Sequence, residues 1–180
     1  GYPMRLFVPG CEGNISVKWL TQIKLTREPT HFRDETSKYT DTQLDRKSQQ
    51  FTFPMGIKSV ITAPSGQMKL ERQGIYQVTG IAWSGRGSIR RVEVSADGGR
   101  TWADAMIDSH QSEKALARFT IPWQWSGGDA VLQSRATDSQ GNVQPTRTSL
   151  VTEKGNISTY HFHGIQSWAV NTAGDVANVY

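Results

Sequence analysis

The chain has 180 residues, a formal net charge of +4 and a single cysteine. Its length suits one full domain with part of another, and one cysteine excludes an internal disulfide framework. No apolar run approaches the roughly 18 residues of a membrane span, and the lysines and arginines are scattered along the chain. We therefore expect no membrane span and no nucleic-acid binding.

Two short strands are predicted at the start of the chain, in residues 4–8 and 15–25, as the last edge of a preceding domain. The residues that follow are polar and charged, with too few apolar side chains for a core, which predicts a linker. The predicted division is the end of one domain over residues 1–26, a linker over 27–50, and a second domain over 51–180.

From Phe51 onward, strand signals recur with turn signals between them every 8–12 residues or so. This pattern is typical of an all-β fold, an antiparallel β-sandwich of the immunoglobulin type. No helical periodicity of useful length appears, and the aromatic-rich tail over residues 160–180 is expected to fold back onto a partner surface. The strands are expected at residues 57–62, 74–83, 89–96, 102–107, 115–125, 130–137 and 143–151.

Residues 81–102 form the most clearly defined stretch. Its central strand alternates, so that Val92 and Val94 face the core and the opposite face is wet. Asp97-Gly98-Gly99 supplies the positive φ angles of a tight hairpin. Just before this strand, glycines flank Arg86, which is either a solvated turn residue or a clamp for an anion.

Other candidate chemistry is sparse. His161 and His163 form a His-x-His pair, but two ligands alone make an incomplete metal site, so we expect pocket-lining or surface residues and predict no metal site. Cys11 is expected to be a plain buried or interface cysteine, because a neighbouring carboxylate would raise its pKa. The glycine-bounded loop over residues 10–13, with Lys18 nearby, suits an anionic group such as a phosphate; a solvated lysine after a loop is the alternative.

Taken together, several motifs resemble those of the sulfite oxidase family of molybdenum enzymes. The motif Pro9-Gly10-x-x-Gly13 and residues 16–20 resemble the end of that family's molybdopterin-binding domain. Residues 59–64 resemble the start of its C-terminal dimerisation domain. The signatures of that second domain are matched by residues 82–87, 92–102 and 138–145. The resemblance covers the whole chain, with the motifs in the right order and spacing.

Within the family, Trp123-Gln124-Trp125 and residues 133–138 and 165–170 resemble the molybdenum subunit of the sulfane dehydrogenases of bacterial thiosulfate oxidation. That resemblance implies a periplasmic enzyme with molybdopterin and molybdenum as its cofactor. It implies a c-type cytochrome subunit as electron acceptor and a sulfur-carrier protein that presents sulfane sulfur. It also implies homodimer contacts through the sandwich domain.

The resemblance implies roles for five residues. Ser16, Val17 and Lys18 match the segment that contacts the pterin cofactor. Arg86 matches, with a one-residue gap, an arginine near the anionic substrate, and His163 falls where sulfite oxidases place a substrate-binding arginine. Histidine lacks the permanent bidentate charge of arginine, so this departure favours a protein-bound sulfane substrate over free sulfite.

A second departure concerns the metal ligand. Cys11 does not match the family's cysteine ligand to molybdenum, which would lie upstream, so these 180 residues alone are expected to be inactive. Three alternatives remain open: a sulfite dehydrogenase, a dimerisation module without activity of its own, and a secreted sandwich adhesin. The adhesin would not need Arg86 and Lys18 to point at a shared pocket.

Overall fold

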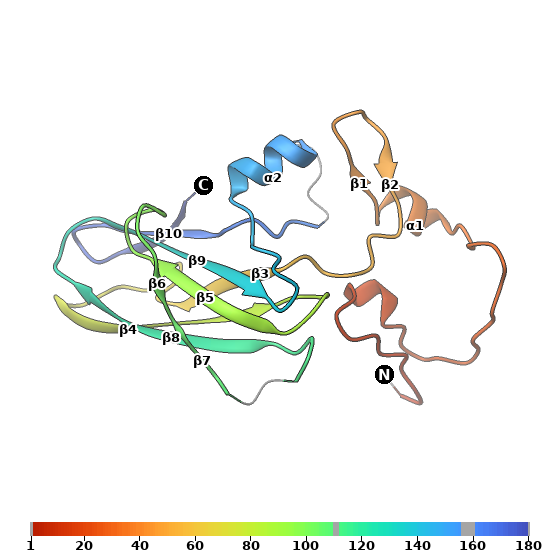
Figure 1. Cartoon of the computed structure of the whole chain (residues 1–180), viewed down its shortest axis with the longest axis horizontal. Coiled ribbons are helices and arrows are strands. Elements are labelled where there is room, and N and C mark those ends of the chain that lie inside the picture. The colour runs from red at the N-terminus through yellow and green to blue at the C-terminus, as the bar shows by residue number, and fades with distance from the viewer. Residues whose placement is uncertain (1, 110–111, 156–160, 180) are drawn as a thin grey trace.

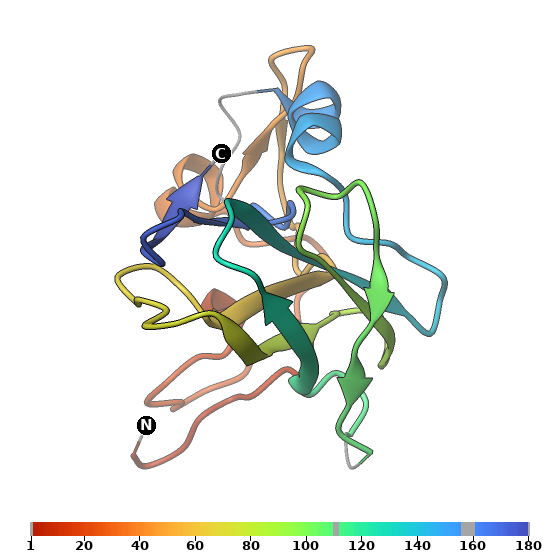
Figure 2. The same cartoon turned by 90° about the vertical axis from the view of Figure 1, so that its left-hand side faces the viewer.

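The computed structural model of the chain describes residues 2–109, 112–155 and 161–179. Its larger part is a sandwich of two antiparallel β-sheets, and the first 57 residues or so lie beside one end of this sandwich (Figure 1). Figure 2 views the sandwich from its other end, where the two sheets form separate layers. The predicted all-β sandwich is therefore confirmed.

One layer is a four-stranded sheet with the strand order β3-β4-β8-β7. Its longest pairing joins β4 and β8 over nine residue pairs, from Gly74–Trp125 to Ala82–Ala117. At Gly80 an added Cβ would lie 2.2 Å from the ring of Phe119, so the glycine makes room for this buried aromatic side chain. The strands are β3 (Lys58–Ala63), β4 (Gly74–Trp83), β7 (Met106–Ile107) and β8 (Ala117–Trp125).

The other layer is a five-stranded sheet with the order β11-β10-β9-β5-β6. The expectation that the tail folds onto a partner surface is wrong, because the tail supplies β10 and β11 of this sheet. The indole of Trp168 donates a hydrogen bond to the carbonyl of Ile61 at 3.1 Å, so this aromatic residue ties the two layers together. The strands are β5 (Ile89–Ser95), β6 (Ala103–Asp104), β9 (Ala130–Asp138), β10 (Ser167–Val170) and β11 (Val176–Val179).

The side chains of β5 were predicted to alternate between a buried and a wet face, and only the buried face is as predicted. Val92 is fully buried as expected, but Glu93 on the face expected to be wet is only 6% exposed. Its carboxylate is paired with Arg135 at 2.9 Å and with Arg91 at 3.2 Å, which offsets the cost of removing a charge from water. A face that pattern alone marks as solvated is therefore buried through ion pairs.

The hairpin after β5 is confirmed. Gly98 and Gly99 have φ angles of 73° and 89°, in the region that favours glycine. Asp97 accepts hydrogen bonds from the hydroxyl group of Thr101 at 2.6 Å and from its backbone N–H at 2.9 Å. These bonds to Thr101 hold the pKa of Asp97 well below its ordinary value, so the turn is closed by an ionised carboxylate.

A helix replaces the last predicted strand. Instead of a strand over residues 143–151, the chain forms α2 (Arg147–Lys154). The Thr146 hydroxyl caps its start by accepting a hydrogen bond from the Ser149 N–H at 3.1 Å. Leu150 is the one residue of α2 that is buried, so the helix has too short an apolar face to produce a recognisable period.

The segments before the sandwich are less regular than predicted. Residues 4–8 and 15–25 do approach each other in antiparallel fashion, through a bridge between Arg5 and Lys18. They do not form full strands, since Trp19 has a φ angle of 52° that interrupts the extended backbone. The predicted linker holds ordered elements, and its boundaries stay a prediction. The elements of this part are η1 (Gly13–Ile15), α1 (Arg33–Ser37), β1 (Asp41–Thr42) and β2 (Ser48–Gln49).

A buried glutamine joins the two layers of the sandwich near the end of β3 that adjoins the N-terminal part. The side chain of Gln144 is 2% exposed, and its Oε1 accepts from the Ser59 N–H at 2.9 Å and the Ala136 N–H at 3.3 Å. Ser59 belongs to β3 in one sheet and Ala136 to β9 in the other. The Nε2 of Gln144 donates to the Ser59 carbonyl at 3.3 Å, so the amide of Gln144 satisfies backbone groups of both layers.

We predict that Gln144→Leu lowers the free energy of unfolding by about 2–4 kcal/mol, because two buried N–H groups lose their acceptor at roughly 1–3 kcal/mol each. Urea denaturation measures the change. The matched control is Gln140→Leu at an exposed position, which should stay within about 0.5 kcal/mol of the parent. Equal stability of the two variants would contradict this role of Gln144.

Candidate functional site

Three separate segments meet where the N-terminal part adjoins the sandwich: residues 10–13, residues 52–58 and residues 161–164. Backbone hydrogen bonds connect the first two, since the Met55 N–H donates to the Gly10 carbonyl at 2.9 Å. Between the segments lies a cavity of about 290 Å³. It is lined by Glu12, Gly13, Met55, Gly56, Lys58, Trp83, His161, Phe162 and His163.

The loop that carries Arg86 closes one side of this junction. The Gly85 N–H donates to the Met55 carbonyl at 2.9 Å. A Cβ at Gly85 would lie 2.2 Å from the carbonyl oxygen of Gly10, so only glycine permits this approach. Gly85 therefore serves backbone packing between the two parts of the chain, whereas Gly87 makes room for Ser139 within the sandwich.

His161 is held by hydrogen bonds to both ring nitrogens. Its Nε2 accepts from the Gly56 N–H at 2.7 Å, so the proton of the neutral ring lies on Nδ1. That Nδ1–H donates to Glu12 Oε1 at 2.9 Å. Both nitrogens are thus engaged, which makes His161 a fixed part of the cavity wall.

His163 differs from His161 in its environment. The ring is half-buried, and its Nδ1 is buried with no hydrogen-bond partner among the described residues. Burial, then the charge of Lys154 and the nearness of His161, lower the pKa of His163 from its ordinary value of 6.5 to about 4. At neutral pH the imidazole of His163 is therefore uncharged.

Lys58 supplies the cation of the cavity. Its Nζ donates to the carbonyl of Phe162 at 2.8 Å and lies 5.6 Å from the centre of the Phe162 ring. Burial lowers the pKa of this ammonium group. A lysine has three N–H donors, so one hydrogen bond to Phe162 leaves donor capacity toward the cavity.

Of the five residues implied by the resemblance, only His163 lies in the cavity wall. Arg86 is exposed, as are Val17 and Lys18, while Ser16 is half-buried and accepts a hydrogen bond from the Val8 N–H at 3.4 Å. The structure therefore does not bring Arg86 or Ser16–Lys18 to the same pocket as His163.

Sequence reasoning missed two residues of the cavity, Glu12 and Lys58, whereas His161 and His163 were expected as pocket-lining or surface residues and both line it. Glu12 and Lys58 are far apart in the sequence, and no spacing indicates that they meet. The buried charge of Glu12, which is 7% exposed, is the feature that distinguishes it, and it becomes visible only in the fold.

The fit of the implied cofactor rests on Lys18. Its ammonium is exposed, 5.6 Å from the centre of the Trp19 ring, and makes no ion pair with a carboxylate in the described ranges. A point charge so placed suits the phosphate of a pterin cofactor. No group of three His, Cys, Asp or Glu side chains in the part of the chain that is described could hold a metal ion.

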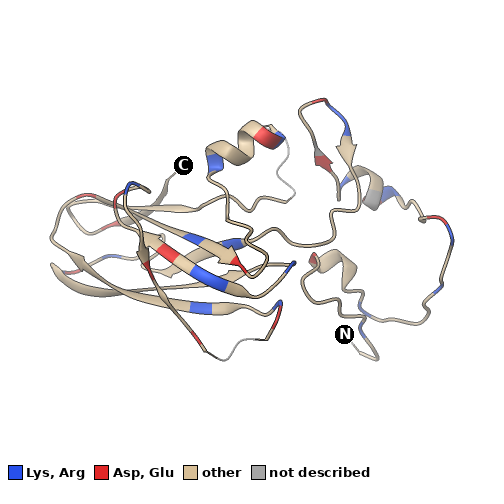
Figure 3. Ribbon diagram, viewed as in Figure 1, with Lys and Arg blue, Asp and Glu red and all other residues tan. Residues whose placement is uncertain are grey.

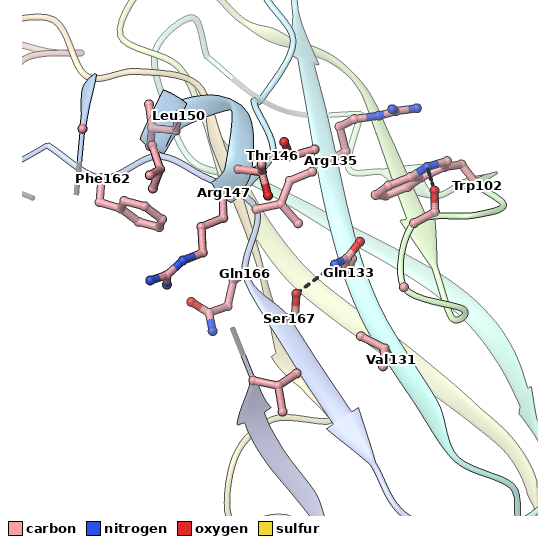
Figure 4. A pocket seen from close by; sticks show the side chains of 17 residues that line it. Trp102, Val131, Gln133, Arg135, Thr146, Arg147, Leu150, Phe162, Gln166 and Ser167 are labelled. Atoms are coloured by element: carbon pink, nitrogen blue, oxygen red, sulfur yellow. Dashed lines mark hydrogen bonds between the residues drawn. The ribbon is translucent and has the colours of Figure 1, made fainter. Parts of the chain in front are cut away.

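A larger cavity, of about 780 Å³, lies between α2 and the five-stranded sheet (Figure 4). Arg135 stacks over the Trp102 ring at 4.3 Å, and Gln133 donates to the Ser167 hydroxyl at 2.8 Å. The charge of Arg135 is already paired with Glu93, and a second cation, Arg147, lines this cavity 6.0 Å from the centre of the Phe162 ring. None of the five implied residues lines it.

The distribution of charge agrees with the expectation from the sequence. Lysines and arginines are spread over the sandwich and the N-terminal part, between acidic residues (Figure 3). Among the helices that the structure describes, none has the length and apolar character needed to cross a membrane.

Two protein families match the chain. The family described as "Mo-co oxidoreductase dimerisation domain" matches residues 49–167, and the "Oxidoreductase molybdopterin binding domain" matches residues 1–33. The cavity lies where these two regions meet, since its walls come from residues 12–13 and from residues 55–163.

Individual proteins that are similar to the chain belong to the same group of enzymes as these two family matches. A sulfite oxidase of Gallus gallus is 30% identical over 174 residues, covering 88% of this chain and 37% of that protein. A nitrate reductase [NADH] of Brassica napus is 31% identical over 173 residues, covering 82% of this chain and 19% of the reductase. The chain thus spans less than half the length of either relative.

Among solved structures, the sulfane dehydrogenase SoxCD from Paracoccus pantotrophus is similar along the whole chain, with a TM-score of 0.97 and 45% identity. The match covers 46% of that protein's chain. Arg86 and Lys18 do not share a pocket, which was the feature expected of an adhesin, but these similarities favour a molybdenum-cofactor oxidoreductase over it. The chain belongs to the sulfite oxidase family of molybdenum-cofactor oxidoreductases, and most of it is that family's dimerisation domain.

Proposed function

We propose that the chain is the C-terminal part of a molybdenum-dependent sulfane dehydrogenase subunit, which oxidises sulfane sulfur bound to a carrier protein. The whole-length similarity to a sulfane dehydrogenase supports this proposal. This similarity is the observation that carries it, and His163 agrees with it: burial lowers the pKa of this cavity-wall residue, which the family resemblance matches to a substrate-binding arginine of sulfite oxidases.

The chemistry of the two substrates differs in charge. Free sulfite is a small oxyanion, for which a guanidinium is the best partner because it is always charged and binds two oxygens at once. A neutral imidazole offers one N–H and no net charge. It suits a sulfur chain that is covalently attached to a protein and is held in place mainly by that protein.

The chain's own residues would divide the work between two places. Lys58 and His163 would contact the substrate in the cavity, and Trp83 would form part of an apolar wall. Ser16, Val17 and Lys18 would hold the pterin cofactor, with Lys18 at its phosphate. Bound molybdenum would supply the transfer of oxygen and electrons. Its cysteine ligand would come from a preceding part of the protein, and Arg86 keeps only the role of an exposed cation near the junction.

The partners follow from the same proposal. Electrons would leave through a c-type cytochrome subunit, and the substrate would arrive on a sulfur-carrier protein in the periplasm. The sandwich would make homodimer contacts, consistent with the description of its family. The second candidate is a sulfite dehydrogenase, which the similarity to a sulfite oxidase favours. A dimerisation module without activity is the third.

We predict that His163→Arg in the full-length, cofactor-loaded protein shifts specificity toward sulfite. The added guanidinium should raise kcat/KM for sulfite by about tenfold or more, and it should lower kcat/KM for the carrier-bound sulfane. Steady-state kinetics with both substrates measures the shift. Gln73→Arg, which adds the same charge to the exposed β3–β4 hairpin, is the control and should change neither value. Rapid sulfite turnover by the parent, unaffected by His163→Ala, would favour the sulfite dehydrogenase.

A second prediction concerns pH and stability. The pKa of His163 is about 4 in the fold and near 6.5 when unfolded, so between these values the unfolded chain binds more protons than the native one. Stability due to neutral His163 is therefore present above about pH 6.5 and is lost as the pH falls toward 4. Because the ring is half-buried, we expect on the order of 1–2 kcal/mol.

Urea denaturation of the parent and of His163→Gln at about pH 7 and about pH 4.5 tests this prediction. Glutamine does not titrate, so the variant should lose less stability on acidification than the parent does. Equal losses would mean that His163 is not held neutral by the fold.

A further inference from the structure

We propose that Glu12 is a positioning residue that, through His161, sets the place of the His163 imidazole in the cavity. This proposal rests on the proposed function of the cavity as the sulfur-substrate site. It concerns Glu12 and His161, neither of which matches a motif quoted for the family resemblance as a substrate or cofactor residue.

The carboxylate of Glu12 is buried and accepts hydrogen bonds from two neighbouring side chains. It is 7% exposed, and its Oε1 accepts from the Thr52 hydroxyl at 2.9 Å as well as from the His161 Nδ1–H at 2.9 Å. A carboxylate removed from water to this extent is costly unless such donors satisfy it. Glu12 therefore favours the arrangement in which Thr52 and His161 both reach it.

His161 is attached at its side chain and at its backbone. The ring is held between the Glu12 carboxylate and the Gly56 N–H. The backbone N–H of His161 donates to Asp41 Oδ1 at 3.3 Å, and the Asp41 carboxylate is itself 2% exposed and 3.4 Å from Lys154 Nζ. Residue 161 is thus fixed from several directions, two residues before His163.

His163 is placed mainly by packing against these groups. Its ring centre lies 5.5 Å from that of His161. On another side it lies against Gly56, where an added Cβ would be 2.7 Å from its Cγ and 2.9 Å from its Nδ1. Nδ1 has no hydrogen-bond partner among the described residues, and the contacts that place the ring are those with His161, including a hydrogen bond with its backbone, and with Gly56.

The geometry points to a chain of dependence from Glu12 to His161 and from His161 to His163. Loss of the Glu12 acceptor frees the His161 ring to rotate away from Gly56, which removes one wall of the His163 site. A small displacement of a group that contacts substrate is enough to weaken productive binding strongly. Glu12 therefore acts on the substrate without touching it.

The test uses the full-length, cofactor-loaded protein with Glu12→Leu and Glu12→Gln. Leucine has a similar size but no acceptor, whereas the glutamine amide oxygen still accepts from the His161 Nδ1–H. Glu12→Leu should raise KM for the carrier-bound sulfane by about tenfold with little change in kcat. Glu12→Gln should stay within about twofold of the parent. If Glu12 only stabilised the fold, Glu12→Leu would not change KM while leaving kcat unchanged, and Glu12→Gln would not restore the KM of the parent.

Two readouts do not depend on activity. Imidazole ¹⁵N NMR should show a proton fixed on His161 Nδ1 in the parent and in Glu12→Gln, and tautomer exchange in Glu12→Leu. Crystal structures should show the His163 ring displaced from Gly56 only in Glu12→Leu. An unchanged ring position in Glu12→Leu, or an unchanged KM with an active parent, would overturn the proposal.

The control separates this effect from loss of stability. Leu70→Ala removes a core side chain that is 3% exposed, in the loop at the opposite end of the β3–β4 hairpin from the cavity. It should destabilise the fold and leave KM unchanged. If the parent oxidises no sulfane substrate while His163 still moves in Glu12→Leu, the positioning role stands and the proposed function fails.

Discussion

The contact between the Glu12 carboxylate and the His161 ring joins the N-terminal part of the chain to the sandwich. Both groups are buried or nearly so, and each has a further hydrogen-bond partner, Thr52 for Glu12 and Gly56 for His161. If the Glu12 carboxylate and the His161 ring were separated while still buried, the carboxylate would lose a hydrogen-bond donor, at a cost of about 1–3 kcal/mol or more. The shape of the cavity therefore depends on this polar contact together with the backbone hydrogen bonds of Met55 and Gly85.

This origin explains the chemistry of the cavity wall. The same packing that holds His163 against Gly56 removes it from water, and removal from water keeps its imidazole uncharged. Lys58 remains as a cation but already donates to the Phe162 carbonyl. The cavity is thus polar and weakly charged, which distinguishes it from a site built around a guanidinium.

The sandwich was predictable because its strands carry their own signals. The β4 strand begins at Gly74 and ends at Trp83, the bounds that the sequence pattern predicts. The α2 helix was not predictable, because a short polar helix has no clear period. The tail strands were not predictable either, because an aromatic tail suits both a core and an interface. The candidate site was predictable at His163, through the family resemblance, and at the His161–His163 pair, which was expected to line a pocket or lie at the surface. Glu12 and His161 are 149 positions apart, and a pair of this kind exists only once the chain is folded.

The central claim is that the cavity at the junction of the two family regions is the place where sulfur substrate is bound. The most direct measurement is a crystal structure of the full-length, cofactor-loaded protein with a persulfidated peptide from its carrier, located by the anomalous signal of sulfur. We expect the terminal sulfur to lie in the cavity of about 290 Å³, in contact with His163. Binding of the peptide sulfur elsewhere, for example in the cavity beneath α2, with His163 untouched, would contradict the account.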